Sequence, residues 1–112
     1  MKDYYRKWTS GDVDGAMESV AEDVFCRAPG VDISDKGEYR EFIAKFAPRL
    51  TGVSEIAEFT DGDRVVLFYY PQTAATSTAV CAECMTVRAG KIVENVMTFD
   101  RLSYSQPSGS ES

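Results

Sequence analysis

The chain has 112 residues and no histidine, and its 18 acidic and 12 basic residues give a formal net charge of -6. This length corresponds to one domain, and a negative chain with scattered basic residues argues against nucleic acid or an anionic membrane as a partner. The lack of histidine excludes the Ser-His and Cys-His nucleophile systems and removes the commonest zinc ligand. No apolar run reaches the roughly 20 residues of a membrane span, and the N-terminus lacks the apolar segment of a secretion signal. We therefore expect a cytoplasmic protein with reduced thiols.

A short first helix is predicted at the N-terminus. Tyr4, Tyr5 and Trp8 fall on one side of it, and it stops at Ser10-Gly11. Its start is abrupt, as though a helical turn were missing.

Two further helices are predicted from caps and apolar periodicity. Asp12 caps the second, whose apolar face carries Val13, Ala16, Met17 and Val20. A short strand, "DVFCRAP", follows. Asp35 and Glu38 have the spacing of a capping box for the third helix, which ends at Pro48 and repeats its stripe at Tyr39, Phe42, Ile43 and Phe46.

After Pro48 the periodicity becomes that of strands. Turns are predicted at Asp61–Asp63 and at Ala89-Gly90, with a break at Pro71. "RVVLFYY" is apolar on both faces, which predicts a central strand covered on both sides. The "DGD" turn lacks the further acid that a calcium loop needs. The expected strands are 53–59, 64–70, 76–88 and 91–102. Helices followed by a mostly antiparallel sheet indicate an α+β fold in one domain over 1–104, with 105–112 as a disordered tail.

Cys81 and Cys84 form a C-x-x-C pair inside a predicted strand. Strand side chains alternate between faces, so residues three apart point to opposite sides and cannot share a metal ion. We interpret both cysteines as packing residues and expect neither a metal nor another cofactor.

Glu83 shares a strand face with Cys81, Met85 and Val87, and this is the more apolar of the two faces. If it points inward, the carboxyl group loses hydration, its pKa rises, and it can stay protonated and donate a hydrogen bond. The alternative register exposes Glu83 to solvent or pairs it with Arg88 or Arg64.

Four stretches resemble a known family: "YYRKWTSGDVDGAMESVAEDVFCRAP", "GEYREFIAKF", "FTDGDRVVLFYY" and "AECMTVRAGKIVENVMTFDR". They are similar to the SnoaL-like, ketosteroid isomerase-like branch of the nuclear transport factor 2-like superfamily, over roughly residues 4–101. The resemblance implies a cone-shaped, strongly curved sheet wrapped by three helices, a cystatin-like α+β roll with an apolar pocket. It also implies a homodimer formed through the sheet.

The resemblance implies a pair of oxyanion-type donors. Ketosteroid isomerases hold an enolate oxygen with a tyrosine of the first helix and a neutral acid of a late strand. Counting back from Gly11 places the tyrosine at Tyr4. Counting back from Gly90, with a hairpin one residue shorter, places the acid at Glu83.

The family's proton-shuttling base has no match in this chain. In ketosteroid isomerases it directly precedes the proline after the first strand, where this chain has Ala28. The SnoaL-like cyclases place an acid on the last strand, where the inward positions here are Asn95, Met97 and Phe99. Asp23, Asp32 and Asp100 are the available replacements. Arg27 either pairs with a neighbouring acid or orients an anionic substrate.

Three functions stay open. The first is a pocket protein that binds a small apolar or polycyclic carbonyl or phenolic molecule through Tyr4 and Glu83, with isomerase or cyclase activity through an enolate. The second is a non-catalytic ligand-binding or dimerisation domain that has lost the base. The third is a protein-interaction module that binds a partner on the open sheet face. The expected pocket lining is Trp8, Cys26 (or Phe25), Ala28, Phe42, Phe46, Tyr69, Cys81, Met85, Met97 and Phe99.

Overall fold

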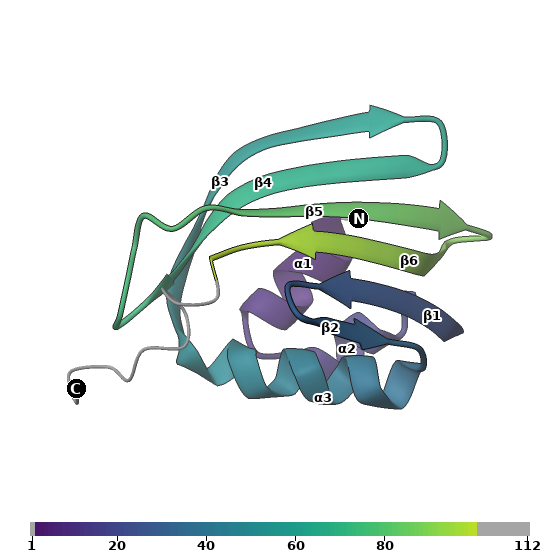
Figure 1. The fold of residues 1–112 in the computed structure, drawn as a ribbon, viewed down its shortest axis with the longest axis horizontal. Coiled ribbons are helices and arrows are strands. Elements are labelled where there is room, and N and C mark those ends of the chain that lie inside the picture. Colours follow the sequence, from purple (N-terminus) through teal and green to yellow (C-terminus); the bar gives the residue numbers. More distant parts are fainter. Residues whose placement is uncertain (1, 101–112) are drawn as a thin grey trace.

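A curved, six-stranded sheet folds over three helices in the computed structural model, which describes residues 2–100 (Figure 1). The helices are α1 (Lys2–Thr9), α2 (Val13–Met17) and α3 (Lys36–Phe46), followed by the 3-10 turn η1 (Ala47–Arg49). The strands are β1 (Val20–Ala28), β2 (Val31–Ile33), β3 (Leu50–Asp61), β4 (Arg64–Thr73), β5 (Cys81–Arg88) and β6 (Lys91–Thr98). The α+β class predicted from the order of the elements is therefore confirmed.

The sheet has the strand order β2-β1-β6-β5-β4-β3, and only the β1 and β6 neighbours run parallel. Its curvature follows from register shifts in several strands, including two in the long β3–β4 pair. The helices lie on one side of the sheet, with α3 below β1 and β2 and α1 behind the central strands in Figure 1. The enclosed face of the sheet therefore meets the helices, and the other face does not.

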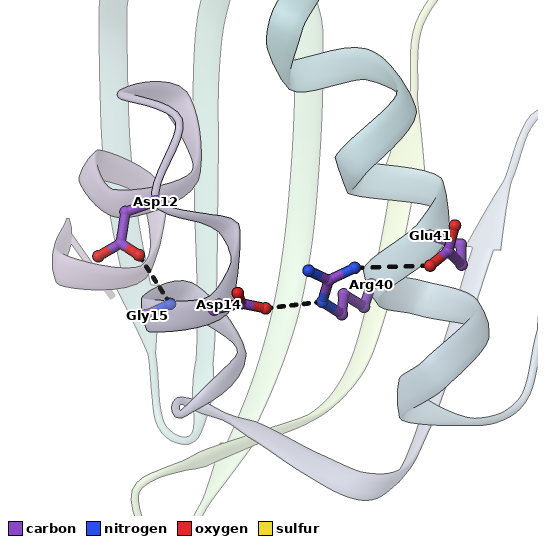
Figure 2. Close-up of polar contacts among 5 residues, drawn as sticks. All are labelled: Asp12, Asp14, Gly15, Arg40 and Glu41. Atoms are coloured by element: carbon purple, nitrogen blue, oxygen red, sulfur yellow. Dashed lines mark hydrogen bonds and ion pairs between the residues drawn. The ribbon is translucent and has the colours of Figure 1, made fainter.

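The second helix begins where the sequence predicts and ends earlier. The Asp12 carboxylate caps it by accepting a hydrogen bond from the Gly15 amide at 2.9 Å. The helix stops at Met17, because Val20 already belongs to β1. Arg40 of α3 donates to Asp14 at 2.7 Å and so connects the two helices, as Figure 2 shows.

The third helix has the predicted N-cap. Asp35 accepts a hydrogen bond from the Glu38 amide at 2.8 Å, whereas the Glu38 side chain accepts from Ser34 at 3.4 Å and not from the cap residue itself. The reciprocal half of the capping box is therefore displaced by one residue. The third helix was predicted to end at Pro48, but α3 already ends at Phe46, and Pro48 lies inside η1, two residues farther on.

Several strand boundaries differ from the prediction. Pro71 lies within β4, since the pairing of β4 with β5 stops at Tyr69 and the proline needs no donor on that side. Residues 76–80 precede β5 without joining it, and β2 was not predicted because three residues are too short to show a periodicity. The predicted end of the last strand at 102 and the tail at 105–112 lie outside the described residues.

The two faces of the sheet differ in burial. The predicted inner side of α1 is confirmed, because Tyr4, Tyr5 and Trp8 are all buried. β4 is an internal strand, as predicted, but its outer face is only partly covered in the single chain, where Phe68 is 36% exposed. Within residues 2–100, no helix is both long enough and apolar enough to cross a membrane.

Candidate functional site

A cavity of about 350 Å³ lies between the enclosed face of the sheet and the helices. α3 contributes two aromatic rings to its wall, Phe42 and Phe46, because helix positions four apart lie on the same side. Seven of the residues expected to line a pocket do line this cavity: Trp8, Phe42, Phe46, Tyr69, Cys81, Met97 and Phe99.

Three expected lining residues lie elsewhere in the core. Cys26, Ala28 and Met85 are buried, but they are not part of the cavity wall. Met85 pairs with Val65, two residue pairs beyond the pair of the cavity residue Glu83 with Leu67. The prediction was wrong for these residues because strand alternation gives the face of a side chain but not its position along the groove. Phe25 was the alternative to Cys26 as a lining residue. It is half-buried and lines a different hollow, whose other lining residues are mostly charged.

Glu83 is the only acidic side chain in the described cavity wall, and it is 3% exposed. The inward register is therefore confirmed. The Tyr69 hydroxyl donates to Glu83 Oε2, and Asn95 Nδ2 donates to Glu83 Oε1 at 2.9 Å. Burial raises the carboxyl pKa above its ordinary value, and these two hydrogen bonds oppose that rise only in part. The site thus favours a neutral carboxyl group at the inner end of an apolar cavity.

The hydrogen bonds continue away from the cavity. Asn95 Nδ2 also donates to the Tyr39 hydroxyl at 2.9 Å, and the Tyr39 and Tyr4 hydroxyls are hydrogen-bonded to each other. Together with Glu83 and Tyr69 they form a buried chain of polar groups from α1, α3, β6, β5 and β4. We call these five residues the polar chain.

Three members of the polar chain were not predicted as polar contacts, and Tyr69 among them was predicted only to line the pocket. Tyr39 counted only as part of the apolar stripe of its helix, and Asn95 only as an inward position without a base. The signal was present, since a buried tyrosine hydroxyl or asparagine amide needs a hydrogen-bond partner. Their partner could not be chosen, because residues 39 and 95 belong to different elements.

Tyr4 is not part of the cavity wall. Its hydroxyl meets Tyr39, and its pKa is raised by burial first and then by the nearby Tyr39 and Glu83. Tyr69 lines the cavity beside Glu83, and burial likewise raises the pKa of its phenol. The two hydroxyl-bearing groups that face the cavity are therefore those of Tyr69 and Glu83.

The candidate replacement bases lie outside the cavity. Asp32 is exposed and accepts two hydrogen bonds from Arg27, at 2.9 and 3.0 Å, and this partner lowers its carboxyl pKa. Arg27 accordingly has the surface-pairing role that the sequence allowed. Asp100 and Asp23 are also exposed, and Asp100 lies by a hollow on the outer sheet face next to Phe68.

The C-x-x-C cysteines are on opposite faces of β5, as strand alternation predicts. Cys81 lines the cavity, whereas Cys84 is half-buried on the other face, opposite Val66 and Val96. Burial raises the pKa of the Cys81 thiol above its ordinary value. This thiol is therefore a poor nucleophile at neutral pH.

The chain is similar to a known domain family and to several solved structures. The SnoaL-like domain model matches residues 1–95. A crystal structure of a protein from Kribbella flavida DSM 17836 is 34% identical, with a TM-score of 0.87 and coverage of 92% of this chain and 85% of that one. A nuclear transport factor 2-like protein from Cytophaga hutchinsonii is 14% identical, with a TM-score of 0.74 and coverage of 88% and 85%. TerC, co-crystallized with polyporic acid, is 23% identical, with a TM-score of 0.71 and coverage of 90% and 88%. None of the curated proteins matches the chain.

Proposed function

Because the chain belongs to the SnoaL-like domain family, we propose that it binds a small, flat carbonyl or phenolic compound in its apolar cavity. At the inner end, the protonated Glu83 and the Tyr69 hydroxyl, which turns from Glu83 to the ligand on binding, each donate a hydrogen bond to the oxygen of this ligand. The observation that carries the proposal is a carboxyl group that is 3% exposed, has a raised pKa and lines the cavity. A buried neutral acid is costly to keep unless its hydrogen is used.

This proposal revises the pair taken from the family resemblance. Tyr69 replaces Tyr4 as the phenol at the ligand, since Tyr69 lines the cavity and Tyr4 does not. Tyr4 becomes a positioning residue that acts on Glu83 through Tyr39 and Asn95.

Direct binding tests the proposal. We would titrate 4-phenylphenol, a steroid-like ketone and polyporic acid, which was crystallised with TerC, into wild type, Tyr69→Phe and Glu83→Gln, using calorimetry. Loss of one ligand hydrogen bond should weaken binding by about 5- to 10-fold in each variant. Tyr70→Phe is the matched control, because Tyr70 is half-buried on the outer side of the same strand. If no compound binds, or if Tyr70→Phe weakens binding as much as Tyr69→Phe, the proposal fails.

Isomerisation or cyclisation through an enolate is the second candidate. Once the Tyr69 hydroxyl turns from Glu83 to the ligand, it and the protonated Glu83 are suitable donors to an enolate oxygen. In the described cavity wall, however, Glu83 is the sole carboxyl group, so no second carboxylate there can move the proton. We therefore expect a bound ketone to exchange its α-protons with deuterated solvent no faster than free ketone does. Faster exchange, measured by NMR, would favour the enzyme.

For the outer sheet face we propose a second copy of the chain as the partner. Exposed apolar side chains gather there, among them Phe59, Phe68, Val80 and Val96. The strand register supports this, since Phe59 is opposite Val66 and the Phe59 and Phe68 rings are 6.5 Å apart. Contiguous exposed apolar surface of this kind is typical of an interface.

A further inference from the structure

Two cationic side chains are part of the cavity wall, and neither is explained by a neutral ligand. Lys45 is in the last turn of α3 and Arg49 ends the following turn η1, and both are exposed. They lie four positions apart, on either side of the wall residue Phe46 in the sequence. The outer part of the cavity therefore carries positive charge, whereas Glu83 is at the buried inner end.

Among the described residues, the cavity wall has two cationic side chains and one acid. Glu83 is the only acidic residue in the described lining, and its buried carboxyl group favours the neutral form. Lys45 forms no ion pair among residues 2–100. A hollow lined by charges of one sign concentrates ions of the opposite sign, even in a chain whose net charge is -6.

The Arg49 guanidinium has a defined position at this opening. Its Cζ atom lies 5.9 Å from the centre of the Phe46 ring, which is itself part of the cavity wall. A planar guanidinium held against an aromatic ring presents its N–H groups in a fork that matches a carboxylate. Lys45 adds a second point charge, four positions earlier in the chain.

From this arrangement we infer that the ligand is an amphiphilic anion: a flat apolar body with a carbonyl or phenol at its inner end and a carboxylate at its outer end, next to Lys45 and Arg49. The inference rests on the proposed function, because it adds a second contact to the same ligand. It specifies the ligand class as hydroxylated or keto aromatic carboxylic acids.

The test uses three matched probes that share one ring system. They are 4-phenylphenol, 4′-hydroxybiphenyl-4-carboxylate and the methyl ester of that acid, each titrated into wild type, Lys45→Gln and Arg49→Gln by calorimetry. The acid should bind wild type about tenfold more tightly than the ester at low salt, and this ratio should shrink as added salt screens the charges. Each variant should lower the ratio of the acid's association constant to the ester's about threefold.

Arg88→Gln is the control, because it removes the same charge from a residue paired with Asp63 at the far end of β5. The acid-to-ester ratio is unaffected by any general loss of stability, such as the loss of a favourable cation at the end of α3. It should therefore stay at the wild-type value in the control and fall only in the two cavity variants.

The possible failures can be told apart. Equal binding of acid and ester overturns the inference, while binding of 4-phenylphenol that weakens in Tyr69→Phe still supports the proposed function. An equal drop of the ratio in Arg88→Gln also overturns the inference, since the charge effect would then not be local. If acid binding depends on Lys45 and Arg49 but not on Tyr69, the anion site stands and the proposed inner contacts fail. If none of the probes binds, both fail.

Discussion

Glu83 determines the chemistry of the cavity at the scale of single residues. An ionised carboxylate buried without a cation loses several kcal/mol of hydration, and two hydrogen bonds return only part of this. Its partners, Tyr69 and Asn95, are both uncharged, and no ion pair to Glu83 occurs within the described residues. The neutral form is therefore the one that the surrounding side chains stabilise.

Replacing Glu83 should separate the contribution of its volume to stability from the contribution of its titratable group. Glu83→Gln keeps the volume and should change the free energy of unfolding by less than about 1 kcal/mol, whereas Glu83→Ala leaves a hole and strands two donors, at about 2–4 kcal/mol. Urea unfolding at pH 7 measures both. Glu58→Ala on the exposed part of β3 serves as control and should stay within about 0.5 kcal/mol. Equal, negligible effects at position 83 would contradict its burial.

The pH dependence of stability follows from the same group. The pKa of Glu83 is raised above its ordinary value of 4.5 in the folded chain, so the folded state binds more protons than the unfolded state between these two pKa values. The free energy of unfolding should therefore fall as the pH rises from about 4.5 to the folded pKa. Chemical denaturation across this range would show it as a difference between wild type and Glu83→Gln, which has nothing to titrate there. Parallel profiles would mean that the carboxyl group is not perturbed.

At the scale of elements, the β5–β6 hairpin brings the inner polar groups together. Its register sets Glu83 opposite Met97 and Asn95 opposite Met85, so that the amide and the carboxyl group become diagonal neighbours on one face. A slip of one strand by one residue would turn its side chain to the other face and separate the two groups. The turn that fixes the register contains Ala89 with φ 52° and Gly90 with φ 78°.

The turn at Ala89 offers a stabilising substitution. A left-handed backbone costs an alanine about 1 kcal/mol or more, and glycine does not pay this cost. Ala89→Gly should therefore raise the free energy of unfolding by about 0.5–1 kcal/mol after the larger entropy of the unfolded glycine is counted. Thermal melting measures the change, and Gly90→Ala should move the melting temperature in the opposite direction. A lower stability of Ala89→Gly would show that the alanine is not strained.

At the scale of the whole molecule, the sheet has one face against the helices and cavity and one face with exposed apolar residues. β4 illustrates the division, because Leu67 and Tyr69 are buried while Phe68 is 36% exposed. The second copy proposed for the outer face would explain why this strand is apolar on both sides.

A charge on the outer face tests this association. Phe68→Lys should convert a dimer into a monomer at micromolar concentration, because the lysine would bury an unpaired charge in the interface. Light scattering after size exclusion gives the mass, and Glu58→Lys is the control for an added positive charge on an exposed strand position. A monomeric wild type, or a dimer that survives the substitution at Phe68, would contradict the proposal.

Much of the fold could be predicted because its determinants are local. The structure has the caps Asp12 and Asp35 and the turns before Arg64 and Lys91 where expected, because each depends on residues close in sequence. Strand alternation likewise put Glu83 on the more apolar face of its strand, and the structure shows that this face is the buried one. The exceptions include Val20, Pro71, residues 76–80 and β2, whose states depend on where a neighbouring strand begins or ends.

The sequence by itself determined the α+β class, the alternation that puts Glu83 on the more apolar face of its strand, and most of the apolar wall, because periodicity and capping are properties of short segments. Only the tertiary structure decided which groups meet. It placed Tyr69 rather than Tyr4 at the cavity, connected Tyr39 and Asn95 to Glu83, and brought Lys45 and Arg49 to the opening. Each of these contacts joins elements that are far apart in the chain, and the curvature of the sheet, which arises from register shifts across several strands, sets the distances between them.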